Sequence, residues 1–147
     1  MSFTIRGAEP ADAPALRELF LRSRRQTFVW QPAEAFALAD FDAQTQDEQL
    51  WVALDDAARP IGFIALWAPE RFIHHLYVDR AWAGRGVGRA LLRALPGWPQ
   101  TRFVLKCLSL NEGAQAFYRA CGFTLAGSGG TGDSAYLLLA SRADDAH

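Results

Sequence analysis

The chain has 147 residues, of which 50% are hydrophobic and 21% are charged, a composition typical of one globular domain with a single core. The formal net charge of −1 gives no support to a nucleic-acid or anionic-membrane partner, and the sequence shows neither an apolar run of membrane-spanning length nor a signal peptide. We therefore expect a single domain over residues 1–147, in the cytoplasm.

Hydrophobic periodicity predicts the elements in the first half of the chain. An amphipathic helix is expected to open at Asp12 and Pro14. The irregular aromatic and polar segment 25–46 indicates one or two short helices with loops, starting at Pro32. The expected strands are, in chain order, 3–6, 50–54, 60–67 and 70–78, of which the second and third form a hairpin and the last is apolar on both faces and therefore central.

The second half of the chain predicts two helices, each set between strands. The helix expected over 87–95 is stopped by Pro96 and Gly97, and the helix over 112–121 ends at Gly122, whose missing Cβ suits a left-handed cap. The order of elements predicts an α+β sheet, with helices on both faces and one crossover to a parallel strand. The remaining expected strands are 102–107, 123–126 and 135–140, with a loop at 127–133.

Alternating glycines mark the turn between the central strand and the helix over 87–95: Gly84, Gly86 and Gly88. No Ser, Thr, Asp or Asn caps this helix, so its first amide N–H groups stay free beside Arg80, Arg85 and Arg89. A bound polyphosphate would accept hydrogen bonds from these amides and neutralise the arginines. The spacing is not the G-x-G-x-x-G of a dinucleotide site, and the Lys of a Walker loop is missing. A tight turn that needs positive φ is the structural alternative.

A second motif runs from Asn111 to Phe123. Asn111 follows a predicted strand and is placed to cap the next helix, and Tyr118 lies two turns further along the same face. Taken singly, each residue is also explained by ordinary structure, as a helix cap and a half-buried tyrosine.

Together the two motifs resemble the GNAT superfamily of acetyl-CoA-dependent N-acetyltransferases, most strongly over residues 60–126. The diphosphate signature of that family, Gln/Arg-x-x-Gly-x-Gly/Ala, is matched from Ala83 to Gly88, with Ala83 departing at the first position. The resemblance implies a mixed, mostly antiparallel sheet of six to seven strands with splayed central parallel strands. It also implies an acetyl-CoA-binding core at about 60–126 and acceptor-pocket helices at about 12–46.

The resemblance further implies an acyltransferase that moves an acetyl group from acetyl-CoA, as cosubstrate, to a primary amine in a ternary complex. Pantetheine would lie along the central strand and the diphosphate on the amides that follow it. An arginine such as Arg80 or Arg85 would reach the 3′-phosphate. The residues expected to bind the cosubstrate are Leu76, Tyr77, Val78, Gly84, Arg85, Gly86, Val87, Gly88, Arg89, Asn111, Phe117 and Tyr118.

By the same resemblance, Tyr118 is expected to act as general acid beside the thioester sulfur. Some members of the superfamily place a glutamate base five residues before the asparagine, but Lys106 stands there in this chain. His74 matches a histidine of certain members and is the candidate base. Strand alternation predicts that His74 and His75 point to opposite faces, with His74 on the side of Leu76. A histidine hydrogen-bonded into the sheet is the alternative.

No metal is expected, because the sequence offers no cluster of His, Cys or Asp ligands, and Cys107 and Cys121 are expected to be reduced thiols. The acceptor is expected to be an amine of a small molecule or peptide, and Asp40 or Asp42 could pair with its ammonium group. The protein is expected to be a monomer or a homodimer. A non-catalytic acyl-CoA-binding sensor module and a nucleotide-binding protein are the alternative functions.

Overall fold

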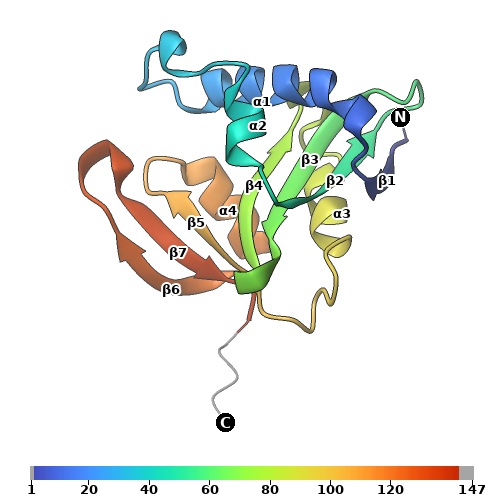
Figure 1. Cartoon of the computed structure of the whole chain (residues 1–147). Coiled ribbons are helices and arrows are strands. Elements are labelled where there is room, and N and C mark those ends of the chain that lie inside the picture. The colour runs from blue at the N-terminus through green and yellow to red at the C-terminus, as the bar shows by residue number, and fades with distance from the viewer. Residues whose placement is uncertain (1, 143–147) are drawn as a thin grey trace.

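The computed structural model describes residues 2–142, which form a seven-stranded sheet with four α-helices (Figure 1). The strands are β1 (Thr4–Gly7), β2 (Gln49–Leu54), β3 (Pro60–Trp67), β4 (Phe72–Val78), β5 (Val104–Leu108), β6 (Thr124–Gly129) and β7 (Tyr136–Ala140). The helices are α1 (Ala13–Thr27), α2 (Asp40–Gln44), α3 (Val87–Arg93) and α4 (Glu112–Ala120).

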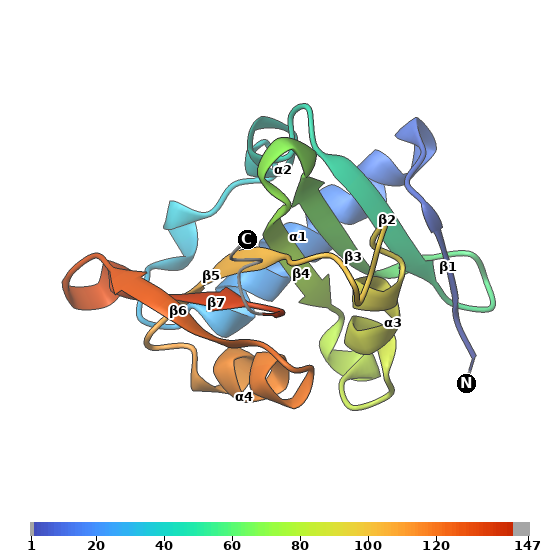
Figure 2. The ribbon, with the colours of Figure 1, turned by 90° about the horizontal axis from the view of Figure 1, so that it is seen from below.

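The strands follow the order β1-β2-β3-β4-β5-β7-β6 across the sheet. Paired strands are antiparallel except β4 and β5, which are parallel and lie in the middle. Helices α1 and α2 cover one face of the sheet, and α3 and α4 cover the other (Figures 1 and 2). The predicted α+β class, with a mostly antiparallel sheet and helices on both faces, is confirmed.

Each face of the sheet has its own apolar core. On one face, Leu16, Leu19 and Phe20 of α1 pack with Phe41 of α2 against Phe63 of β3, and the i, i+3, i+4 spacing in α1 is that of a helix with one buried side. On the other face, α3 and α4 pack against the sheet through a larger cluster. The sheet therefore holds two independent helical layers in fixed positions on either side of β4.

Some boundaries differ from those expected. Helix α1 continues through Thr27, and the following segment contains only a 3₁₀ turn (Ala33–Ala35) before α2. Strand β4 begins at Phe72 and not at 70, because Ala68–Glu70 forms a 3₁₀ turn and Arg71 adopts a φ of 51°. Strand β6 extends to residue 129, into the expected loop, because it stays paired with β7.

Candidate active site

The parallel strands β4 and β5 separate soon after they meet. Their register contains a single pair, Phe72 with Val104, at the beginning of each strand. Beyond this pair β4 continues toward the glycine turn, whereas β5 is followed by α4 (Figure 1). The predicted splay of the central parallel strands is therefore present, and it opens the sheet beside α4.

A cavity of about 540 Å³ lies along the separated end of β4. Its walls come from the last two turns of α1, the end of β4, the glycine turn with the start of α3, and one face of α4. All of the residues predicted to bind the cosubstrate line it except Arg85. The lining residues are Ser23, Gln26, Thr27, Leu76, Tyr77, Val78, Arg80, Trp82, Ala83, Gly84, Gly86, Val87, Gly88, Arg89, Asn111, Ala114, Phe117 and Tyr118.

The glycine turn presents main-chain groups to this cavity. Gly84 and Gly86 have φ values of 74° and 83°, a conformation that a side chain would strain. Gly86 is the N-cap residue of α3 and provides no side-chain cap. A Cβ added at Gly88 would lie 2.8 Å from Cζ of Phe117, so a larger residue there would displace this ring, which lines the cavity. The turn is thus shaped for close approach of a ligand to the backbone.

The arginines around the turn occupy different positions. Arg80 and Arg89 line the cavity, and Arg89 also donates a hydrogen bond of 3.3 Å to the carbonyl oxygen of Ala120. The Arg85 guanidinium instead lies over the ring of Trp82, 5.7 Å from its centre, outside the lining. Two cationic side chains are therefore near the open amides, and the third is at the periphery.

Helix α4 carries the second motif into the same cavity. The Asn111 side chain accepts a hydrogen bond of 3.2 Å from the amide of Ala114, as expected for a helix cap. Two turns later the ring of Tyr118 is buried between Phe117 and Phe123, at centroid distances of 5.2 and 5.4 Å. Burial raises the pKa of the Tyr118 hydroxyl well above its ordinary value. The hydroxyl is therefore protonated at every physiological pH, so it can donate a hydrogen bond or its proton but is not present as a phenolate base.

Strand β4 contains a bulge at its two histidines. In the register with β3, His75 pairs with Ala65. The next pair is Ile73 with Leu66, so His74 is an additional residue. The rings of His74 and His75 consequently stack, with centroids 3.8 Å apart and planes 30° apart. The expectation that they point to opposite faces is wrong, because the bulge interrupts the period of two along the strand.

The His75 ring packs toward α1. Its centroid lies 4.9 Å from that of Phe20 and 6.2 Å from that of Tyr77. Burial, together with the charge of His74, lowers the pKa of His75 to about 3. His75 is therefore neutral at physiological pH, whereas the His74 side chain is 39% exposed and accessible to solvent.

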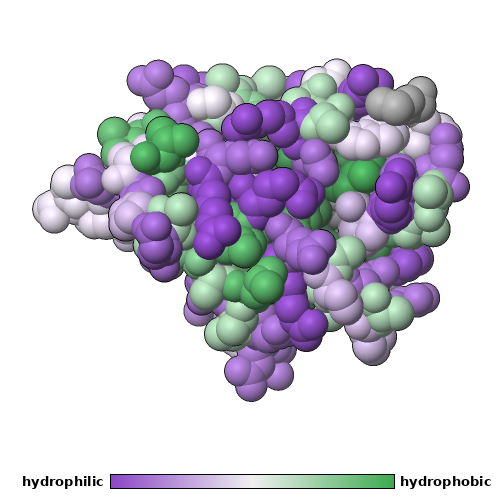
Figure 3. Space-filling model, turned by 90° about the horizontal axis from the view of Figure 1, so that it is seen from above, coloured by the Kyte–Doolittle hydropathy of each residue, from purple (hydrophilic) through white to green (hydrophobic). Residues whose placement is uncertain are grey.

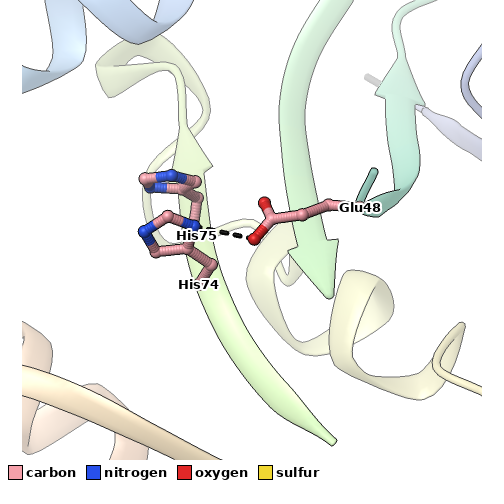
Figure 4. A group of neighbouring side chains, drawn as sticks. All are labelled: Glu48, His74 and His75. Atoms are coloured by element: carbon pink, nitrogen blue, oxygen red, sulfur yellow. Dashed lines mark hydrogen bonds and ion pairs between the residues drawn. The ribbon is translucent and has the colours of Figure 1, made fainter. Parts of the chain in front are cut away.

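Glu48 joins this pair from a distant part of the sequence. It directly precedes β2, and the register of β2 with β3 carries the start of β2 to Leu66, opposite the bulge. Its Oε2 lies 2.8 Å from Nδ1 of His74 (Figure 4). Nothing in the local sequence around Glu48 indicates this contact, which depends on the registers of two strand pairs.

Glu48, His74 and His75 form a cluster of residue types that can bind a metal ion. Each offers one possible ligand atom, a ring nitrogen or a carboxylate oxygen, and these three atoms lie within 4.8 Å of one another. The expectation that the chain has no cluster of possible metal ligands is therefore wrong. It assumed that strand alternation places His74 and His75 on opposite faces, whereas the bulge brings them to the same side. A direct hydrogen bond already joins Nδ1 of His74 to Glu48. His75 joins this pair by stacking on the ring of His74 and not by a hydrogen bond to either residue.

The segment between α1 and β2, residues 28–48, lies on the face of the sheet that α1 covers, and we call it the roof segment. The guanidinium of Arg24 lies between the rings of Phe20 and Phe36, 4.0 and 4.8 Å from their centres, and binds Asp40 at 2.8 Å. Asp42 likewise binds Arg17 at 2.8 Å. Both carboxylates expected to meet an acceptor ammonium are thus engaged in ion pairs within the protein.

The outer surface of this roof is mostly hydrophilic, with hydrophobic side chains in small groups (Figure 3). Val29 and Leu38 are the most exposed large apolar residues of the roof segment, at 75% and 48%. Elsewhere in residues 2–142, Cys107 and Cys121 are free thiols, as expected. Among these residues no helix has the length and apolar character needed to cross a bilayer.

Comparison with known proteins identifies relatives of this architecture. A family model described as Acetyltransferase (GNAT) family matches residues 13–123. An aminoglycoside N(6′)-acetyltransferase type 1 from Stenotrophomonas maltophilia is 32% identical over 137 residues, which cover 82% of this chain and 85% of that protein. An uncharacterized N-acetyltransferase of Escherichia coli (strain K12), YafP, is 35% identical over 98 residues, which cover 62% of this chain and 63% of that protein.

Solved structures show the same fold. The apo form of YjaB from Escherichia coli superposes with a TM-score of 0.74 at 26% identity, covering 95% of this chain and 97% of that chain. The PaiA N-acetyltransferase from Thermoplasma acidophilum, solved in complex with coenzyme A, gives a TM-score of 0.76 at 20% identity, with 95% and 98% coverage. At this lower identity the likeness concerns the fold alone.

Proposed function

The chain belongs to the acetyltransferase (GNAT) family and is an acyltransferase, and from this premise we propose that it acetylates a primary amine of a small molecule with acetyl-CoA. The transfer is direct, in a ternary complex: a bond forms between the amine nitrogen and the acetyl carbon as the bond from that carbon to sulfur breaks. The observation that carries the proposal is that one cavity joins the open glycine turn, the free end of β4 and Tyr118.

The cavity fits acetyl-CoA in its chemistry. The turn and the start of α3 offer main-chain amides for the diphosphate, with Arg80 and Arg89 beside them. The end of β4, no longer paired with β5, leaves main-chain groups of Leu76 and Val78 available to the pantetheine arm. Bound there, acetyl-CoA would supply an activated acyl group, and the proton transfers would fall to side chains of the protein.

Tyr118 is the proposed general acid. Its hydroxyl stays protonated because burial raises its pKa, so it can donate a hydrogen bond to sulfur as negative charge develops there. A simple thiol has a pKa near 8.5, so a donor placed beside the sulfur assists its departure at neutral pH. Asn111 supports this role because it caps the helix that carries the tyrosine.

His74 is the proposed base. It lies on β4 two residues before Leu76, which lines the cavity, and its side chain is partly exposed. Because Nδ1 contacts Glu48, Nε2 is the nitrogen that takes the proton lost by the attacking amine. The protons balance over the cycle: the amine proton moves to Nε2 of His74, and the leaving sulfur takes the hydroxyl proton of Tyr118. The proton held on His74 then passes through water to restore the tyrosine hydroxyl.

The acceptor class is proposed from the relatives and the roof together. A relative of known substrate class acts on aminoglycosides, which are small polyamines. The roof segment adds an aromatic cluster, in which the ring of Phe28 lies 5.6 Å from that of Trp30 and 6.2 Å from that of the buried Phe36. Aromatic faces attract the ammonium groups of such acceptors.

Release of free thiol from acetyl-CoA, measured with a panel of aminoglycosides, polyamines, arylalkylamines and amino acids, tests the proposal. Tyr118→Phe should lower kcat by about 100-fold while the Kd of coenzyme A, from calorimetry, changes by less than about threefold. Unchanged turnover would remove Tyr118 as the acid. Binding of acetyl-CoA without transfer to any amine would favour a sensor module instead.

A further inference from the structure

Glu48 is a buried carboxyl group whose negative charge is compensated by one neighbouring side chain, His74. Its side chain is 6% exposed, and its Oε1 has no hydrogen-bond partner among the described residues. Burial raises the pKa of the Glu48 carboxyl, whereas the charge and hydrogen bond of His74 act to lower it. A buried carboxylate is costly unless a cation or a donor compensates it. His74 is the described group that does so.

The contact also decides which nitrogen of His74 is free. When Glu48 is ionised its carboxylate only accepts, so Nδ1 of His74 then donates the proton in the 2.8 Å hydrogen bond to Oε2. In the neutral ring the other nitrogen, Nε2, is then an acceptor. Figure 4 shows this second nitrogen directed away from Glu48. The geometry therefore selects the tautomer that a base needs.

Resting on the proposed role of His74, we propose that Glu48 is a positioning residue of the acetyl transfer. It holds His74 in the Nδ1–H tautomer and stabilises the imidazolium that forms when Nε2 takes the amine proton. The step balances, because the proton leaves the amine nitrogen and stays on His74 until water removes it. The arrangement follows the general pattern in which a third group orients a catalytic base.

Among the described titratable groups near His74, Glu48 is the one that can orient its ring and stabilise its charge. His75, stacked on the ring from the same strand, is neutral at physiological pH because burial lowers its pKa to about 3. Arg24 of α1 acts on His75, but its guanidinium is bound to Asp40 of α2 at 2.8 Å. From the segment before β2, Glu48 is the charged group in direct contact with the imidazole.

A double-mutant cycle tests this inference. Glu48→Gln should lower kcat by about tenfold with the KM for acetyl-CoA unchanged, because the neutral amide no longer favours the imidazolium. In a His74→Gln background the same substitution should change kcat by less than about twofold, since the residue acts only through His74. Glu70→Gln, in the exposed turn before β4, is the matched control and should leave kcat unchanged.

The outcomes separate the inference from the proposed function. A slow His74→Gln with a normal Glu48→Gln overturns the role of Glu48 and leaves His74 as the base. A normal His74→Gln overturns both. The role of Glu48 is also overturned if the two substitutions lower kcat independently of each other. The same holds if a lowered melting temperature of Glu48→Gln accounts for its loss of kcat. Imidazole ¹⁵N NMR of the unaltered protein should show neutral His74 as the Nδ1–H tautomer, and the Nε2–H tautomer would contradict the inference whatever the variants do.

Discussion

The glycine turn and the Glu48–His74–His75 cluster supply the two halves of the proposed reaction by different means. The turn offers main-chain amides from one run of residues, 84–89, whereas the cluster joins side chains that are 26 residues apart. Main-chain donors exist whatever side chains surround them, so we expect the site to stay intact although Ala83 stands at the Gln/Arg position of the signature. Side-chain clusters have no such tolerance, because each atom is positioned by the registers of two strand pairs and a bulge.

The largest effect on coenzyme A binding is expected at Gly88, where the backbone of the turn packs closely against the Phe117 side chain. Gly88→Leu should weaken coenzyme A binding by about 100-fold, because the new side chain meets Phe117, whose Cζ already lies 2.8 Å from an added Cβ. Calorimetry measures the Kd. Gly113→Leu is the control, since a Cβ there meets nothing within 4 Å. Equal affinities for the two variants would show that the amides alone determine binding.

The cluster should make stability depend on pH. The His75 pKa is lowered from 6.5 to about 3 by burial, so between these values the unfolded chain binds a proton that the folded protein does not. The free energy of unfolding is therefore fully retained above pH 6.5 and falls as the pH drops toward 3, by about 2 kcal/mol at pH 5 from this residue.

His75→Phe keeps an aromatic ring against Phe20 and removes the titration. Urea denaturation at pH 7 and pH 5 should show a loss of stability on acidification that is smaller in the variant by about 2 kcal/mol. An identical loss in both proteins would mean that His75 is already charged in the folded state.

A substitution at the start of α4 should have a smaller effect on stability, because it removes a single helix-capping hydrogen bond. Asn111→Ala removes the acceptor of the Ala114 amide and should lower the free energy of unfolding by about 1 kcal/mol. Asn111→Ser retains a capping oxygen and should recover most of this in the same urea titration. A stable Asn111→Ala variant with weakened coenzyme A binding would instead assign Asn111 to the ligand.

The smallest effect is expected at the edge of the turn. Arg85→Ala should weaken coenzyme A binding by about twofold, because its guanidinium lies over Trp82 outside the cavity and exposed charges contribute little. Arg89→Ala, at a lining position, should cost about fivefold. A larger loss at Arg85 than at Arg89 in calorimetry would place the 3′-phosphate beside Arg85, one of the two arginines, with Arg80, that the family resemblance suggests for it.

Much of the architecture could be predicted because its signals are local. The central position of β4 follows from its apolar faces, the turn from its glycines, and α4 from a capping asparagine and a terminal glycine. The family and its acyltransferase activity, inferred from the same two motifs, are confirmed. The roles of individual site residues stay predictions.

The sequence by itself therefore determined the order of elements and the glycine turn after β4, since both arise from neighbouring residues. Only the tertiary structure decided that His74 and His75 share a side, that Glu48 meets them, and that Asp40 and Asp42 are engaged by arginines. The physical reason is that one additional residue in β4 reverses the facing of side chains, and strand register brings residues together without any local signal.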